Sequence, residues 1–489
     1  MNDGAVLIYS FVRYRIHGTG KAILKTPSLK NGCLAAVVVA ILSGCGGGGG
    51  GTSVGVASNN GGGSSTPSQY TVSGSITGLG AGASVTLQLN GANSTILSSN
   101  GSFSFNGQLA AGTSYAVTVS KQPNGATCTV TGGAAGVASA TLSPVLVACV
   151  SGGQHLFVTN FGTGTVSVFA LDASNGNLTE VSGSPFAAGT SPIASAVDPS
   201  GQFLYVANLL SNNISAYAIG ATSGILTPVP GSPFATGTKP VSLTIHPTGH
   251  FLYTANQGSN SVSAYLINTS TGVLEPMVAS PVAAGSAPAQ VVIDPAGAYL
   301  FAVNANSDSV SVYSVNATTG ALTIDSASQF SGSSAFSGVG EIAFTPSGTF
   351  AYLGSPGLNA VAAFTENPVS GALTEVVSSQ SATGPAPVSV AVDPTGKFVY
   401  TTNLSNNSVS GYALNPSTGT LTSIPGSGFA TGQGPIAIAF EQSGQYAYVA
   451  NTNDNTLTKF GIDPGTGALV LRSGSPYTTL SGPRGLVIR

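Results

Sequence analysis

Charged residues are scarce in this chain, and tryptophan is absent. Only 6% of its 489 residues are Asp, Glu, Lys or Arg, whereas Gly alone numbers 67. The polar surface must therefore consist mostly of Ser, Thr, Asn and Gly. An apolar content of 42% is sufficient for a buried core, so the composition argues against disorder and favours an all-β chain with many turns.

The few basic residues gather near the start of the chain. Five of them precede a short apolar stretch, 34–42, which is too short to span a bilayer permanently. The sequence Leu42-Ser43-Gly44-Cys45 that follows resembles the lipobox of bacterial lipoproteins. We expect residues 1–44 to be a lipoprotein signal peptide and Cys45 to carry the lipid. The alternative is an ordinary signal peptide in which Cys45 occurs by chance.

This leader predicts an exported protein held in the cell envelope by its lipid, and Gly46 after Cys45 favours the outer membrane. Without residues 1–44 the chain keeps 7 of its 12 basic residues and 14 of its 15 acidic residues, a balance of −7. An acidic chain without a basic cluster argues against nucleic acid as a partner. Membrane contact is therefore expected through the lipid anchor.

Cysteine is also rare, with four residues in all. Cys33 lies in the leader and Cys45 is the expected lipid site, so one pair remains, Cys128 and Cys149. In an oxidising compartment such a pair predicts a structural disulfide. A metal site would need further ligands.

Two segments separate the leader from the main part of the chain. Residues 45–69 are rich in Gly and Ser and read as a flexible tether. Residues 70–150 contain several short runs of alternating polar and apolar residues between Gly and Asn turns. This pattern predicts a small Ig-like β-sandwich that acts as a spacer.

From residue 154 to residue 489 the chain is a tandem repeat. An aromatic run ends in Asn, or once in Ser, at residues 160, 208, 256, 304, 355, 403 and 451, which are 48, 48, 48, 51, 48 and 48 residues apart. Each unit contains four expected strands, and the last of them usually starts with Pro. A unit of this length and chemistry predicts a seven-bladed β-propeller. The final run, 483–489, is expected to complete the first blade and to close the ring.

The repeat region resembles the seven-bladed lactonase family, which includes propeller-type 6-phosphogluconolactonases and whose repeats are similar to the Tyr-Val-Thr-Asn repeats of surface-layer proteins. The aromatic strand ending in Asn and the run Gly482-Pro483-Arg484 carry the resemblance. It implies a site of His, Arg and Glu at one mouth of the channel. Arg484 matches this pattern, whereas Gly485 stands where the family has His.

The third position of the Pro-initiated strands supplies the other candidate site residues. By strand alternation we expect the third position to face the channel axis. Glu341 is the single carboxylate there, and it follows the one long repeat spacing. We predict that Glu341 and Arg484 are the catalytic or orienting residues and that Gln290, Ser242 and Ser389 bind ligand. The alternative is that this blade is merely degenerate.

Four carboxylates at the seventh position are weak metal candidates, and we expect neither a resident metal nor a cofactor. Asp and Glu before a turn more often cap that turn. The four are Asp198, Asp294, Asp393 and Glu441.

The histidines of the repeat region do not favour acid–base catalysis. We expect His155 and His250 to be exposed and His246 to lie far from Glu341. The repeated Asn is interpreted as a loop brace that accepts backbone N–H bonds.

Two functions remain open from the sequence. The first is a binding module that presents its loops to a small polar ligand or to an envelope glycan or protein. The alternative, implied by the family resemblance, is hydrolysis of a sugar-type lactone. A metal-assisted hydrolase is a weaker third interpretation.

Overall fold

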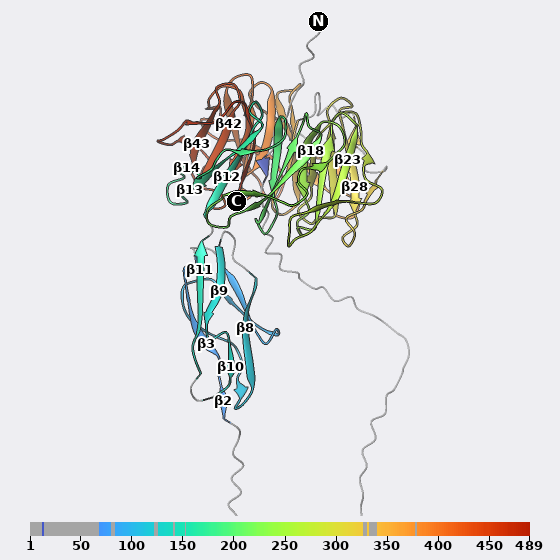
Figure 1. The fold of residues 1–489 in the computed structure, drawn as a ribbon. Coiled ribbons are helices and arrows are strands. Elements are labelled where there is room, and N and C mark those ends of the chain that lie inside the picture. The colour runs from blue at the N-terminus through green and yellow to red at the C-terminus, as the bar shows by residue number, and fades with distance from the viewer. Residues whose placement is uncertain are drawn as a thin grey trace, which may run out of the picture.

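The computed structural model describes residues 12–13, 68–79, 84–121, 126–139, 142–151, 153–325, 330–331, 340–376 and 379–489. All of the regular elements in these ranges are strands, which confirms the all-β prediction (Figure 1). None of the described segments forms a helix of the length and hydropathy that a membrane span requires. The predicted leader, the tether and Cys45 lie outside these ranges, apart from β1 (Val12–Arg13).

The first domain is a small β-sandwich. One sheet has the order β10-β8-β4-β5, the other has the order β6-β3-β11-β9, and β2 pairs with β7. Apolar side chains from both sheets, such as Leu87 and Val147, form one buried cluster. The strands are β2 (Gln69–Tyr70), β3 (Ser73–Thr77), β4 (Val85–Leu89), β5 (Asn93–Leu97), β6 (Gly101–Ser104), β7 (Leu109–Ala110), β8 (Ser114–Lys121), β9 (Ala126–Gly132), β10 (Ala135–Val137) and β11 (Val145–Ser151).

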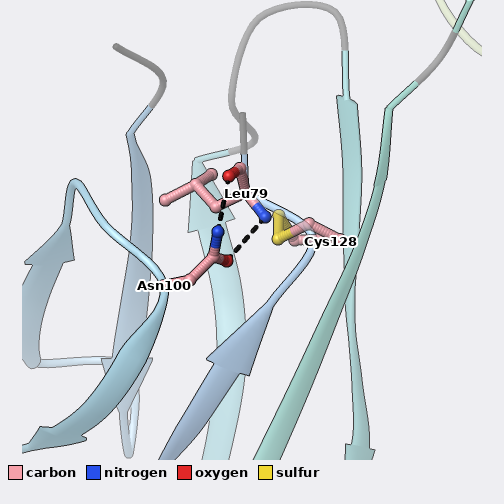
Figure 2. The surroundings of a disulfide bond; sticks show 4 residues. Leu79, Asn100 and Cys128 are labelled. Atoms are coloured by element: carbon pink, nitrogen blue, oxygen red, sulfur yellow. Dashed lines mark hydrogen bonds between the residues drawn. A yellow bond between two sulfur atoms is a disulfide. The ribbon is translucent and has the colours of Figure 1, made fainter. Parts of the chain in front are cut away.

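The predicted disulfide joins β9 to β11. Cys128 and Cys149 are direct cross-strand partners, and their sulfur atoms are bonded. Figure 2 shows that Asn100 braces the loop beside this disulfide. Its side-chain amide donates to Leu79 O and accepts from Leu79 N, both at 2.8 Å. The disulfide and this amide bracket hold one end of the sandwich together.

Residues 154–489 form seven sheets, the blades of the propeller. Blade 1 consists of β46 and β12–β15, and blades 2 to 7 are the successive groups β16–β20, β21–β25, β26–β30, β31–β35, β36–β40 and β41–β45.

Each blade has an inner, a second, a third and a fourth strand. The inner strands are β16 (Pro192–Val197), β21 (Pro240–Ile245), β26 (Pro288–Ile293), β31 (Ile342–Phe344), β36 (Pro387–Val392), β41 (Pro435–Phe440) and β46 (Pro483–Ile488). The second strands are β12 (Gln154–Asn160), β17 (Phe203–Asn208), β22 (Phe251–Asn256), β27 (Tyr299–Asn304), β32 (Phe350–Ser355), β37 (Phe398–Asn403) and β42 (Tyr446–Asn451).

The outer part of each blade follows the same order. The third strands are β13 (Thr165–Leu171), β18 (Asn213–Ile219), β23 (Ser261–Ile267), β28 (Ser309–Val315), β33 (Ala360–Glu366), β38 (Ser408–Leu414) and β43 (Thr456–Ile462). The fourth strands are β14 (Leu178–Glu180), β19 (Leu226–Pro228), β24 (Leu274–Pro276), β29 (Leu322–Ile324), β34 (Leu373–Glu375), β39 (Leu421–Ser423) and β44 (Leu469–Leu471).

A fifth strand of two residues per blade was not predicted. It pairs with the start of the third strand, as Phe234 pairs with Ile214. Two residues are too few for an alternating pattern to appear in the sequence. These strands are β15 (Phe186–Ala187), β20 (Phe234–Ala235), β25 (Val282–Ala283), β30 (Phe330–Ser331), β35 (Ser381–Ala382), β40 (Phe429–Ala430) and β45 (Tyr477–Thr478).

The ring closes as the sequence predicts. β46 pairs antiparallel with β12, so the last strand of the chain is the inner strand of the first blade. The same blade therefore contains both ends of the repeat region. This closure leaves no strand of the ring unpaired at the junction.

Tyrosines of the second strands link neighbouring blades. In five blades a buried hydroxyl donates to the carbonyl of a glycine in the next blade, as Tyr205 does to Gly272 O at 2.9 Å. Gly272 has φ of +75°, and a Cβ there would lie 2.3 Å from the Phe203 ring, so only glycine fits. The other four pairs are Tyr253 with Gly320, Tyr352 with Gly419, Tyr400 with Gly467 and Tyr448 with Gly176.

Candidate functional site at the inner strands

The inner strand of each blade lies at the end of its sheet, with one edge paired to the second strand. Neighbouring inner strands lie side by side around the central axis. Because the sheets radiate from this axis, an inner strand turns its free backbone edge towards the channel and its side chains towards the adjoining blades. The expectation that third-position side chains face the axis is therefore wrong.

Two of the predicted ligand-binding residues instead bond to the next blade. Gln290 donates through Nε2 to Ile342 O at 3.1 Å and accepts through Oε1 from Ile342 N at 2.7 Å. Ser242 accepts from Val291 N at 3.0 Å and lies 3.4 Å from Val291 O. Ile342 and Val291 occupy the fourth position of their strands. A third-position side chain thus satisfies the free edge of the neighbouring inner strand, and we call this contact an edge cap.

Glu341 makes the corresponding contact to blade 6 with an acidic side chain. It is 2% exposed, and its Oε1 atom has no hydrogen-bond partner. Burial raises the pKa of Glu341 well above its usual value, although the Ser389 hydroxyl and the Val390 N–H act to lower it. The carboxyl therefore keeps its proton to higher pH than an exposed glutamate does.

The backbone around Glu341 departs from the other blades. β31 has three residues, whereas the other inner strands have six. Gly340 N donates to Gly354 O at 2.8 Å, and Gly354 N donates to Glu341 O at 3.0 Å, so the ladder continues past the end of the strand. A Cβ on Gly340 would lie 2.8 Å from Gly354 O. The glycines allow the close approach that replaces the usual Pro-to-Asn pairing.

Ser389 is the fourth predicted residue of this group. It is fully buried, and its hydroxyl lies close enough to Glu341 to lower the pKa of that carboxyl, but it makes no hydrogen bond of standard geometry. Its cross-strand partner Thr402 is also buried with an unpartnered hydroxyl. The structure therefore brings together Gln290, Glu341 and Ser389 from blades 4, 5 and 6.

Arg484 does not join this group. Its guanidinium lies over the ring of Phe161 in blade 1, with 5.0 Å between Cζ and the ring centroid. Burial alone lowers the pKa of Arg484, and no cation contributes to the pKa of Glu341. The joint role of the two residues at one mouth of the channel stays a prediction. Arg484 is the second residue of β46 in blade 1, whereas Glu341 precedes β31 in blade 5.

The four weak metal candidates cap their own turns. Asp294 accepts from Ala296 N at 3.1 Å and from Tyr299 N at 2.7 Å. Asp198, Asp393 and Glu441 accept equivalent N–H groups. In the described ranges no three His, Cys, Asp or Glu side chains are grouped as metal ligands. The turn-cap alternative is the one that the structure supports.

The histidines do not approach Glu341. His246 bonds through its two ring nitrogens to Thr248 Oγ1 at 2.8 Å and to Gly297 O at 3.0 Å. His250 is exposed as predicted, but the expectation for His155 is wrong because it is buried. His155 is the second residue of β12 and aligns with Phe203 and Phe251, which lie against a glycine of the next blade. Gly224 lies against the His155 ring in the same way. Burial, and then the charge of Arg489, lower the pKa of His155.

The repeated Asn is a brace, but its bonds run mostly in the opposite direction from the prediction. Asn208 donates through Nδ2 to Asn213 Oδ1 and Ser215 Oγ in the neighbouring strand, and its Oδ1 accepts from Gly189 N. The other five, Asn160, Asn256, Asn304, Asn403 and Asn451, donate to two hydroxyls each.

One electrostatic interaction between acidic side chains of neighbouring blades was not predicted. Glu366 lies at the end of β33, and Asp294 lies beyond β26 in the preceding blade. Burial, and then the charge of Asp294, raise the pKa of Glu366 to about 8. The two residues are 72 positions apart, and nothing in the sequence connects them.

Chemically, the group around Glu341 is suited to hydrogen bonding. A carboxyl with a raised pKa keeps its proton to higher pH and can donate it in a hydrogen bond, whereas only the ionised form can act as a general base. Ser389 and Thr402 each offer a hydroxyl that can donate or accept. No cation or imidazole among the described residues contributes to the pKa of Glu341.

Comparison with known families gives a consistent result for the repeat. The family model described as "Lactonase, 7-bladed beta-propeller" matches residues 122–237, 147–335 and 323–427. These matches together span residues 122–427, which is more than half of the 489 residues. No curated protein matches the chain.

Solved structures show the same propeller fold. A Bacteroides fragilis protein provisionally assigned as a 6-phosphogluconolactonase superposes with a TM-score of 0.61 at 23% identity, covering 69% of this chain and 98% of that one. The periplasmic gluconolactonase of Pseudomonas aeruginosa superposes with a TM-score of 0.58 at 21% identity, covering 68% and 98%. At these identities the likeness establishes the fold alone.

Proposed function

Because the chain belongs to the seven-bladed β-propeller lactonase family, we propose that it is a lipid-anchored protein of the cell envelope that acts mainly as a binding module. The leader ending at Cys45 supports the anchor, and the run of Gly and Ser after it supports a propeller held away from the membrane. Its partner is a small polar ligand or an envelope glycan or protein.

One observation carries the preference for binding over catalysis. The polar side chains at the third position, Gln290 and Ser242 above all, are committed to the backbone of the next blade. Glu341 is buried and its pKa is raised, and Arg484 lies over Phe161 in blade 1. Acid–base hydrolysis needs a base and an acid that converge on one substrate atom.

Lactone hydrolysis is the alternative, and two observations support it. The first is family membership itself. The second is the pair Glu341 and Ser389, which places an acid beside an unpartnered hydroxyl at the one irregular blade. A neutral carboxyl in such a place can donate a hydrogen bond to a lactone carbonyl.

The test uses the full chain produced in a bacterial host. Labelling with radioactive palmitate should mark the wild-type protein and should fail for Cys45→Ala. The detergent-purified protein is then assayed for hydrolysis of glucono-1,5-lactone by acid release at constant pH, with and without chelator. We expect turnover no faster than the spontaneous reaction.

Each alternative has its own signature in that assay. Turnover that Glu341→Ala abolishes and that the exposed control Glu275→Ala retains would establish the lactonase. Turnover that the chelator abolishes would establish the metal-assisted hydrolase. Palmitate labelling of Cys45→Ala would contradict the anchor.

A further inference from the structure

The edge caps cover only part of the ring. Ser242, Gln290 and Glu341 face the free edges of β26, β31 and β36. Farther round the ring the third positions are Ala437, Gly485 and Ala194, which carry no hydrogen-bonding side chain. The inner strands that follow these residues must find other partners for their edge groups.

The inner strand next to Ala437 in the ring is β46, and Leu486 is the fourth residue of this strand. Leu486 pairs with Val158 in β12, just as Val291 pairs with Ala302 in β27. In Val291 the N–H and C=O point away from this partner and meet the cap from Ser242. By the same register the N–H and C=O of Leu486 face the channel, where Ala437 cannot reach them.

A strand of the chain itself occupies this edge. β1 pairs in parallel with β46, so that Val12 stands opposite Leu486 and Arg13 opposite Val487 (dark blue in Figure 1). The inner edge of β46 thus accepts main-chain hydrogen bonds from an extended segment. β1 belongs to the leader, which an exported lipoprotein loses, and this edge then becomes vacant.

We propose that the inner edge of β46 is a site of β-strand addition that binds an extended peptide segment of a partner protein. The peptide runs parallel to β46, and its main chain bonds to the edge groups at Leu486. This inference rests on the proposed function as a binding module and specifies the partner as polypeptide.

The charge of the chain selects the kind of peptide. Without the leader the protein has 14 acidic and 7 basic residues, so a basic segment is favoured electrostatically. Residues 6–17 of the leader, Val-Leu-Ile-Tyr-Ser-Phe-Val-Arg-Tyr-Arg-Ile-His, combine β-branched and aromatic residues with two arginines. They include β1 and therefore serve as the probe.

The experiment measures binding of a fluorescein-labelled peptide with the sequence of residues 6–17 to the exported protein, after mass spectrometry has shown that the leader is absent. The decisive variant is Ala437→Ser, which places a hydroxyl where Ser242 caps the edge of β26. Ser242 and Ser389 are buried at the equivalent position, so the blade tolerates this side chain. Ala194→Ser adds the same hydroxyl two blades away and is the matched control.

We expect saturable binding of the peptide, a loss of about tenfold or more in affinity for Ala437→Ser, and unchanged affinity for Ala194→Ser. A circular dichroism spectrum equal to that of the wild type shows that each variant is folded. Equal effects of the two variants, equal binding of a scrambled peptide, or no binding by the wild type would each overturn the inference. The lactone and palmitate assays are independent of this result, so failure here leaves the binding module itself standing.

Discussion

The free edges of the inner strands are hydrogen bonded differently in two arcs of the ring. Along blades 3 to 5 the third-position residues Ser242, Gln290 and Glu341 reach across to the next inner strand. From blade 7 through blade 2 the residues there are Ala437, Gly485 and Ala194, and β46 pairs with β1. The repeat makes all the edges alike, and one side chain per blade decides whether an edge is closed internally or is left for another strand.

Removing the strongest cap should have the largest effect on this comparison. Gln290→Ala leaves both the N–H and the C=O of the buried Ile342 without their partner, and it also creates a cavity. We expect a loss of about 2 to 3 kcal/mol in the free energy of unfolding, because buried unpaired backbone groups lose their full hydrogen bonds. Denaturant unfolding measures it. Ala437→Gly on the other arc is the control, and an equal loss there would contradict the division into two arcs.

The acidic cap should be weaker than the amide cap in the preceding blade. Glu341→Gln should reproduce the two bonds of Gln290 and should stabilise the protein. Burial raises the pKa of Glu341 in the folded state above the 4.5 of the unfolded chain, so the folded protein binds more protons and the stability of the wild type falls as pH rises above 4.5.

We therefore expect Glu341→Gln to equal the wild type at about pH 4 and to exceed it by about 1 to 2 kcal/mol at about pH 8. Thermal unfolding over this pH range measures the difference. A constant difference at all pH values would show that Glu341 does not carry its proton in the folded state.

The smallest effect is expected at the hydroxyl cap. Ser242→Ala removes one good hydrogen bond to Val291 N at 3.0 Å, and the longer contact to Val291 O contributes little. The expected loss is about 1 kcal/mol by denaturant unfolding. A loss as large as that of Gln290→Ala would contradict this expectation. It would mean that the stabilisation by a cap does not depend on how many backbone N–H and C=O groups the side chain bonds.

The repeat could be predicted because its signal recurs seven times. The aromatic residues, the closing Asn and the initial Pro place each strand, and the strand at 483–488 closes the ring as expected. Cys128 and Cys149 also form the disulfide that the number of cysteines suggested. The seven fifth strands were missed, since two residues make no periodic pattern.

The candidate site was predicted less well. Gln290, Glu341 and Ser389 do lie in three consecutive blades. Residues at the same position of the repeat lie at the same level in neighbouring blades, which brings the three together. Their direction was wrong, since strand alternation says which residues share a face but not where that face points. Arg484 occupies the second position of β46 in blade 1, and the electrostatic effect of Asp294 on Glu366 had no signal in the sequence.

The sequence by itself determined the number of blades, their strand order and the closure of the ring, because these follow from local patterns that repeat along the chain. Only the tertiary structure decided what the third-position residues do. The sheets stand radially, so an inner strand offers its edge to the axis and its side chains to its neighbours. Whether the edge of an inner strand is capped therefore depends on the third-position side chain of the adjacent blade. That side chain is about 50 residues away in the sequence.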